Sequence, residues 1–410
     1  MTASRAASLP VPADFAGPPD DATRRRWTEA DRAHRPERLA ALRSRMAAEG
    51  VDAYFGVKRE HMRWLTGFVL GEGEDKVSGI SGQFLVGGDA VIVVVDSRYA
   101  IQARREARDS TIEEIGYDLP GAWERLLGSL GARRVAVEAT AVPHAQWQRL
   151  EAATPDVELV AVEGWVEALR ADKTPDEVER IAASCAVADR ALAALLPEIR
   201  PGVTERDLAL RLEWLIRTGG AEALAFDVAC LAGPEAALPH GSPGDRPVLA
   251  DTVLLFDFGA QVDGYRSDMT RTMFVGEPIA RDLAVYDLVA RAQGAAITWI
   301  EASVAGGAPP PSRREPDAIA RAVIDADGRW PAYGHGLGHG IGLATHEEPR
   351  FGRLGTDDPV PGRTVFSVEP GIYLAGEMGV RIEDLVHIDI DRRLVERLTR
   401  FPRDVVALPT

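Results

Sequence analysis

Residues 253–272 read Val-Leu-Leu-Phe-Asp-Phe-Gly-Ala-Gln-Val-Asp-Gly-Tyr-Arg-Ser-Asp-Met-Thr-Arg-Thr, two runs joined by the pair Asp263-Gly264. Asp-Gly is typical of the two-residue turn of a β-hairpin. If these two residues form the turn, Asp257 pairs with Thr270 across the two strands. The stretch therefore predicts an antiparallel hairpin.

This hairpin brings two acids together. Asp268 would lie diagonally opposite Asp257 on the same face of the ladder. Isolated acids in apolar strands are costly, and two held together repel each other further, so a bound cation is the economical explanation. The alternative is that both carboxylates are solvated on an exposed face of the sheet.

A glycine-rich segment farther along the chain carries imidazoles. His335, His339 and His346 lie within twelve residues, and five glycines between 334 and 342 allow close backbone approach. A single histidine is more often a satisfied core residue than a ligand, but three among glycines favour a site.

A third segment places two more acids on either side of a second hairpin. Glu369 and Glu383 flank a turn region near Gly376. A three-residue loop centred on Gly376 sets the two acids opposite each other on one face. A four-residue loop would put them on opposite faces unless a bulge intervenes.

Together these segments offer four carboxylates and one or more imidazoles. Such a mixed set suits manganese, cobalt, iron or zinc better than calcium, and it carries more charge than one ion needs. Two divalent ions are therefore expected, manganese before the others. A pair about 3.5 to 4 Å apart can hold a bridging hydroxide and polarise a carbonyl, which indicates hydrolytic chemistry.

Composition excludes several other functions. The 410 residues include 47 basic and 63 acidic side chains, for a formal charge of -16. This charge is of the wrong sign for binding phosphates or anionic lipid, so no nucleic acid and no membrane partner is expected. No signal peptide or transmembrane run is visible, and only two cysteines are present, which favours a cytoplasmic protein.

The order of patterns predicts an α/β (α+β) chain with two domains. Residues 1–33 are interpreted as a flexible arm that is disordered or wraps a neighbour. Residues 34–165 alternate helices and strands in a small mixed α/β domain. Residues 166–410 form the second domain, whose first long helix is announced by a capping box at Thr174. Residues 306–311 are expected to be a loop inside it.

The ordered set Asp257, Asp268, His339, Glu369 and Glu383 resembles the five-ligand signature of the pita-bread metallopeptidases, in the branch of creatinase, aminopeptidase P and prolidase. Residues 165–405 carry the resemblance strongly and residues 38–160 weakly. It implies a creatinase-like N-terminal domain and a C-terminal pita-bread domain that holds two metals. The motifs that carry it are Asp268 to Thr272, the His-Gly-Leu-Gly-His segment at 335–339, His-Glu-Glu-Pro at 346–349, Glu-Pro-Gly at 369–371, Arg-Ile-Glu-Asp at 381–384 and, in the first domain, 63–67 and 96–99.

The resemblance also implies roles for individual residues. The five ligands bind the metals, with Asp268 and Glu383 bridging both, and Glu369 is also the proton shuttle. The implied catalytic set is completed by His240, which steadies the tetrahedral intermediate or leaving amine, His346, which contacts the substrate carbonyl, and Arg381, which orients Glu383. The implied substrate-binding residues are His335 and Arg350.

The expected reaction is hydrolysis of an Xaa-Pro bond, at the N-terminus of peptides or in dipeptides, by a dimetal-bridged hydroxide. Arg350 resembles the arginine that binds a dipeptide's terminal carboxylate in compact prolidases; the alternative is a surface arginine. The long glycine-rich stretch at 71–82 could reshape the pocket. A related hydrolase or lyase acting on a small amino-acid-like substrate is the alternative function, and a binding scaffold without metals is a third. The resemblance further implies a homodimer.

Overall fold

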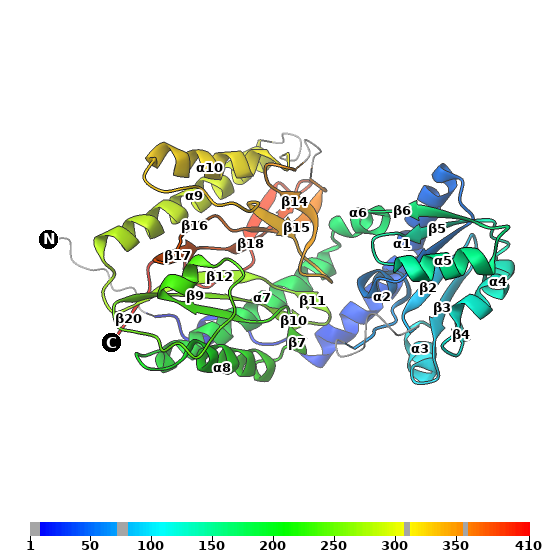
Figure 1. Cartoon of the computed structure of the whole chain (residues 1–410), viewed down its shortest axis with the longest axis horizontal. Helices are drawn as coiled ribbons and strands as arrows, with labels where there is room; N and C mark the ends of the chain where they lie inside the picture. Colours follow the sequence, from blue (N-terminus) through cyan, green and yellow to red (C-terminus); the bar gives the residue numbers. More distant parts are fainter. Residues whose placement is uncertain (1–8, 72–80, 307–311, 356–359) are drawn as a thin grey trace. The chain divides into compact units, whose positions relative to one another are not determined.

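The chain folds into two units, and their division falls after Asp21 and again after Arg170. One unit comprises Ala22–Arg170, and the other joins the segment that ends at Asp21 to Ala171–Thr410 (Figure 1). The computed structural model describes residues 9–71, 81–306, 312–355 and 360–410. Most of the stretch at 71–82 and of the predicted loop at 306–311 therefore lies outside the described residues.

The N-terminal unit is a six-stranded mixed sheet with the strand order β4-β3-β2-β1-β5-β6. Its core contains Phe55 and Trp123, whose rings meet edge to face at 4.9 Å. The predicted mixed α/β class is confirmed here. The elements are α1 (Asp21–Glu49), β1 (Ala53–Gly56), α2 (Arg59–Thr66), β2 (Gln83–Val86), β3 (Val91–Val95), α3 (Ala100–Glu106), β4 (Thr111–Glu114), α4 (Leu119–Leu130), β5 (Arg134–Glu138), α5 (His144–Ala153), β6 (Glu158–Val162) and α6 (Trp165–Ala171).

The first helix is longer than the sequence predicts. Residues 21–33, interpreted as part of a flexible arm, belong to α1, which also contains Pro36. Trp27 is fully buried and lies three helical turns before Arg38, so the two share one buried face with Leu42 and Met46. This buried face is hard to recognise in the arginine-rich sequence, because Trp27 is the one large apolar residue in the first half of the helix.

The described part of the arm before α1 packs on its own chain. Phe15 stacks on Phe401 at 6.3 Å between ring centroids, and the guanidinium of Arg190 donates to the carbonyl of Ala16. A short 3-10 turn, η1 (Pro12–Asp14), precedes them. Phe15 and Ala16 of the arm therefore contact residues of the C-terminal unit of the same chain.

The C-terminal unit layers helices around several small sheets. In Figure 1, α9 and α10 lie on one side of its strands, and α7 and α8 lie on the other. Its elements are α7 (Pro175–Leu195), η2 (Leu196–Glu198), α8 (Glu205–Thr218), β7 (Ala223–Leu224), β8 (Ala229–Ala232), η3 (Gly233–Ala237), β9 (Thr252–Phe258), β10 (Ala260–Val262), β11 (Tyr265–Arg266), β12 (Met269–Val275), α9 (Ala280–Ala305), α10 (Glu315–Asp327), β13 (Gly338–Gly340), β14 (Glu347–Phe351), β15 (Arg363–Val368), β16 (Gly371–Leu374), β17 (Met378–Arg381), β18 (Asp384–Asp389), β19 (Leu394–Arg397) and β20 (Ala407–Leu408).

Four sheets make up this unit, and the two larger ones carry the acids. Their strand orders are β20-β12-β9-β8 and β14-β13-β15-β18-β19, and the smaller ones are β11-β10-β7 and β16-β17. A single apolar cluster joins α9, α10 and the inner faces of the larger sheets. The capping box predicted at the start of α7 is present, with the backbone N–H of Thr174 donating to Glu177 at 2.7 Å. None of the described helices is long and apolar enough to cross a membrane.

The hairpin at 253–272 has the predicted register. Asp263 and Gly264 both have positive φ, 47° and 76°, as a two-residue type I′ turn requires. Asp257 pairs with Thr270 across β9 and β12. Gly259 lets the two strands cross closely, because a Cβ there would lie 1.9 Å from the carbonyl oxygen of Ser267.

The second hairpin resolves the open question about its loop. Leu374 pairs with Met378, so three residues form the loop, and Gly376 at their centre has φ 76°. Continuing this register past Gly371 and Arg381 sets Glu369 opposite Glu383, as the three-residue loop predicts. No bulge is needed.

Gly259→Ala is expected to lower the thermal unfolding midpoint of the C-terminal unit, because the added Cβ collides with a neighbouring backbone. The matched control is Gly294→Ala in α9, where a Cβ meets nothing within 4 Å. There the substitution should stabilise by about 0.5–1 kcal/mol, since glycine is a poor helix former. Differential scanning calorimetry of both variants tests this, and a destabilisation by Gly294→Ala equal to that of Gly259→Ala would contradict it.

Candidate metal centre

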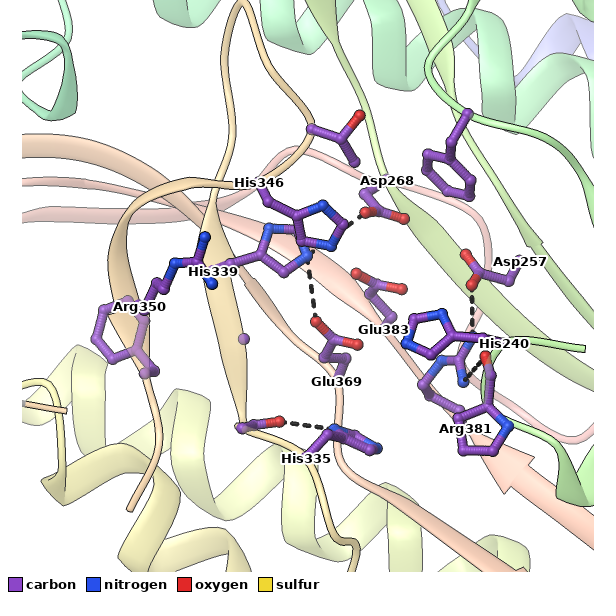
Figure 2. A pocket seen from close by; sticks show the side chains of 16 residues that line it. His240, Asp257, Asp268, His335, His339, His346, Arg350, Glu369, Arg381 and Glu383 are labelled. Carbon is purple, nitrogen blue, oxygen red and sulfur yellow. Dashed lines mark hydrogen bonds and ion pairs between the residues drawn. The ribbon is translucent and has the colours of Figure 1, made fainter. Parts of the chain in front are cut away.

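The C-terminal unit holds a pocket of about 460 Å³ that is lined by side chains of opposite charge. All ten residues singled out from the sequence line it (Figure 2): His240, Asp257, Asp268, His335, His339, His346, Arg350, Glu369, Arg381 and Glu383. Six residues that were not singled out also line it: Phe226, Pro239, Gly336, Gly338, Thr345 and Phe351.

Strand ends and hairpins deliver the acids to this pocket. Asp257 lies near the end of β9 and Asp268 directly precedes β12. Glu369 directly follows β15, and Glu383 directly precedes β18, the strand that pairs with β15. His339 lies in β13, which pairs with β15 beside it. Neighbouring strands of the two larger sheets therefore bring these five side chains into one pocket.

Three of these side chains converge on one point. Ligand atoms of Asp268, His339 and Glu383 lie within 4.8 Å of one another. The Nε2 of His339 is 3.7 Å from Asp268 Oδ2 and 3.4 Å from Glu369 Oε1. The other ring nitrogen, Nδ1, is 3.1 Å from the carbonyl oxygen of Gly340. With Nδ1–H donating to that carbonyl, Nε2 carries a free lone pair toward the acids.

Two carboxylate oxygens at the centre have no hydrogen-bond partner among the described residues. Asp257 Oδ1 and Glu383 Oε1 are buried without a hydrogen bond to any residue that the structure describes. Their sister oxygens are bound: Asp257 Oδ2 accepts from Arg381 at 2.6 Å, and Glu383 Oε2 accepts from Thr270 at 2.7 Å. Each acid thus keeps one oxygen free, as a metal ligand would.

Electrostatics give the same indication. Burial, together with the neighbouring carboxylates, raises the pKa of Asp268 and of Glu383 well above their ordinary values. Burial also raises the pKa of Glu369 and lowers that of His339. A buried group of acids that resists ionisation, next to an unprotonated imidazole, is what divalent cations stabilise. The residues present therefore fit divalent metal ions.

Arg381 contacts a different acid from the one expected. The sequence interpretation has it orienting Glu383, but its guanidinium binds Asp257 directly. It reaches Glu383 through Thr270, whose hydroxyl accepts from Arg381 Nε at 2.8 Å and donates to Glu383. Arg381 and Glu383 are two residues apart and were expected to share a strand face, but this alternation does not determine which nearby acid a long arginine side chain contacts.

Three hydroxyl residues around the centre were not singled out from the sequence. Thr270 bridges Arg381 and Glu383 as described. Ser367 accepts from the backbone N–H of His339 at 3.0 Å and its hydroxyl donates to Glu369 at 2.9 Å. The hydroxyl of Tyr373 accepts from Arg381 at 3.0 Å. For Thr270 the pairing opposite Asp257 was a usable signal; hydroxyl residues are otherwise too common to stand out.

The remaining histidines and Arg350 surround the acids. The ring of His346 lies 4.3 Å from that of His339, and its partial burial lowers its pKa to about 4, so it is neutral at pH 7. His335 Nε2 is 2.9 Å from the hydroxyl of Tyr373. His240 is on the opposite side of the acidic centre from Arg350 in Figure 2. Arg350 pairs with His339 across β13 and β14 and is mostly exposed.

The fold and the donor set together define a metallopeptidase. Residues 179–389 match the model of Metallopeptidase family M24, and residues 38–171 match that of the Creatinase/Prolidase N-terminal domain. The chain belongs to Metallopeptidase family M24, as the sequence resemblance implies, and the family implies divalent metal ions and peptide substrates.

Similar proteins cover nearly the whole chain. The Xaa-Pro dipeptidase of Pyrococcus furiosus is 30% identical over 90% of this chain and 99% of its own length. Among solved structures, Xaa-Pro dipeptidase from Bacillus anthracis is 30% identical, with a TM-score of 0.83 over 91% of this chain and 100% of that one. X-Pro aminopeptidase from Thermotoga maritima is 31% identical, with a TM-score of 0.77 over 88% and 98%.

Asp268→Asn is expected to raise the thermal midpoint of the metal-free protein while removing its response to added manganese. Neutralising one acid relieves burial and repulsion in the metal-free state, but it also removes a ligand. The expected rise is about 2–4 °C for each kcal/mol of relieved repulsion. Asp391→Asn, an exposed acid, is the control and should match wild type with and without metal. A metal-free Asp268→Asn variant less stable than wild type would show that the acids do not repel as described.

Proposed function

We propose that the protein is an Xaa-Pro peptidase that acts on dipeptides in preference to longer peptides. The observation that carries this proposal is the complete donor set: five side chains around one pocket, with two buried carboxylate oxygens that have no hydrogen-bond partner in the part of the chain that the structure describes. Support also comes from two similar proteins that are named Xaa-Pro dipeptidases.

We assign two divalent ions to the five donors Asp257, Asp268, His339, Glu369 and Glu383, manganese before cobalt, iron or zinc. When bound, such ions polarise a carbonyl oxygen and activate water at neutral pH. Asp268, His339 and Glu383 converge most closely and would hold the ions between them. Arg381 keeps Asp257 in place by its 2.6 Å ion pair.

The other side chains supply proton transfer and orientation. Glu369 lines the pocket beside His339 with Ser367 donating to its Oε1, and its carboxylate is assigned to pass a proton to the departing imino nitrogen of proline. His346 and His240 line the same pocket and are assigned to the substrate carbonyl and to the tetrahedral intermediate. His335, held by Tyr373, is assigned to substrate binding.

Arg350 supports the preference for dipeptides. Its side chain lines the pocket, yet it is 68% exposed and its ion pair with Glu348 is long, at 3.9 Å. A guanidinium held so loosely is available to bind a terminal carboxylate in a bidentate manner. In an Xaa-Pro dipeptide that carboxylate belongs to the proline, the residue directly after the scissile bond.

Purified protein loaded with manganese is expected to release proline from Xaa-Pro dipeptides, with metal analysis of the same sample giving two ions per chain. Xaa-Ala dipeptides serve as controls and should be poor substrates. If metal binds but every Xaa-Pro peptide is inert, the substrate proposal fails, and a small amino-acid-like substrate becomes the better candidate. If no stoichiometric metal binds and none activates, a binding scaffold is favoured.

Arg350→Met is expected to raise the KM for Xaa-Pro dipeptides about 10- to 100-fold, the loss of a charge-assisted hydrogen bond worth about 1.5–3 kcal/mol. The KM for Xaa-Pro-Xaa tripeptides should stay within twofold, because their carboxylate lies elsewhere. Arg392→Met, a 65% exposed arginine outside the pocket, is the control for loss of positive charge. An equal rise for both substrate lengths would contradict the assignment.

A further inference from the structure

A buried lysine lies outside the set of pocket residues and binds Glu347, the residue directly after a loop that carries two of them. Only three of the 47 basic residues are lysines, and Lys173 is buried. Its Nζ donates to Glu347 Oε2 at 3.0 Å, with the two side chains 2% and 6% exposed. Desolvating both charges is costly, so the pair by itself is weak support for stability. Its placement suggests a second role.

The carboxylate of Glu347 holds the loop that precedes it. Its Oε1 accepts from the backbone N–H of Ala344 at 2.7 Å, while Oε2 binds Lys173. The N–H of Gly342 donates to the carbonyl of Ala344 at 3.1 Å, which closes the loop on itself. A Cβ at Gly342 would lie 2.8 Å from Glu347 Oε2, so the carboxylate packs directly against the loop backbone.

Lys173 is itself fixed to the sheet that carries the metal ligands. Its backbone N–H donates to the carbonyl of Arg363, the first residue of β15, at 2.7 Å. The guanidinium of Arg363 donates back to the carbonyl of Lys173 at 3.3 Å. The backbone of Lys173 is therefore fixed to β15, and its side chain extends from there to Glu347 at the end of the loop.

His346 lies between two anchored neighbours. On one side, the hydroxyl of Thr345 donates to the carbonyl of Ala225 at 3.0 Å; on the other is Glu347. The imidazole between them reaches the ring of His339 at 4.3 Å. Without the side-chain contact of Glu347, the loop backbone before His346 would lose the hydrogen bond that Ala344 donates to it.

We propose that Lys173 and Glu347 are positioning residues, whose buried ion pair holds the 341–346 loop so that His346 points into the pocket. The kinetic part of this inference rests on the proposed peptidase function, through the role assigned to His346. If the ion pair served stability alone, its loss would lower activity by the same factor whether His346 is present or absent, because independent effects multiply.

The kinetic test is a mutant cycle on the manganese-loaded enzyme. Lys173→Met removes the ammonium that binds Glu347 Oε2, and is expected to lower kcat/KM at least tenfold. In a His346→Ala background the same change should alter kcat/KM less than about twofold. The double variant Lys173→Met/Glu347→Gln removes both buried charges but keeps an acceptor for Ala344, so it should fold; because the ion pair is gone, its kcat/KM should stay at least threefold below wild type. It also keeps the test valid if Lys173→Met alone does not fold.

The matched control is Arg180→Met, which breaks a different ion pair, between Arg180 of α7 and the acids Asp176 and Asp263. Its effect on kcat/KM should be equal in the two backgrounds. A Lys173→Met effect that is equally large with and without His346 would overturn the proposal and leave a stabilising ion pair.

Hydrogen exchange provides a readout that needs no substrate. In Lys173→Met, amides of residues 341–347 should exchange faster than in wild type, while those of α9 stay unchanged. Unaltered protection of 341–347 would overturn the proposal even if activity falls. If wild type hydrolyses no Xaa-Pro peptide, the proposed function fails, but the exchange experiment still decides whether the ion pair holds the loop.

Discussion

The repulsion among buried carboxylates is the constraint on which the rest of the C-terminal unit depends. Four acids end in one pocket with a single guanidinium, that of Arg381, hydrogen-bonded to one of them. Two of their oxygens have no protein partner within the described residues. The apolar packing of the surrounding strands against α9 and α10 offsets the cost of burying these acids. A divalent cation turns the same arrangement from costly to favourable.

Hydrogen bonds from the protein hold the donor side chains by atoms that a metal would not bind. Arg381, Thr270 and Ser367 each occupy one oxygen of an acid and leave the other oxygen of that acid to the pocket. The carbonyl of Gly340 does the same for His339, since it accepts the Nδ1 proton. Asp257, Glu383, Glu369 and His339 are therefore each held by a hydrogen bond before any ion arrives. Such preorganisation reduces the ordering cost of binding.

Much of this arrangement could be predicted from local sequence rules. The Asp263-Gly264 turn fixes the register that opposes Asp257 to Thr270, because a two-residue loop leaves no freedom in pairing. For Glu369 and Glu383 the loop length was ambiguous, and only the structure shows the three-residue loop. How two separate hairpins meet could be inferred only from a family resemblance, because no local rule relates distant strands.

Other features were beyond sequence rules for physical reasons. The start of α1 was missed because its buried face is marked by Trp27 and Arg38, and an arginine does not count as apolar in a periodicity. The direct contact of Arg381 with Asp257 was not predicted, because several acids lie within reach of a long side chain and only the three-dimensional structure shows which one it binds. The Lys173–Glu347 pair joins residues on two distant segments, so no spacing along the chain could have suggested it.

The separation of Asp257 and Glu383 along the chain has a consequence for metal uptake. Neither hairpin by itself offers the full coordination sphere, so an emerging or unfolded polypeptide has no high-affinity chelating segment. Ions must therefore enter after the strands have assembled, and the order of events is folding first and loading second. Occupancy in the cell then depends on which cation is abundant when the finished protein meets it, rather than on the surroundings of its synthesis.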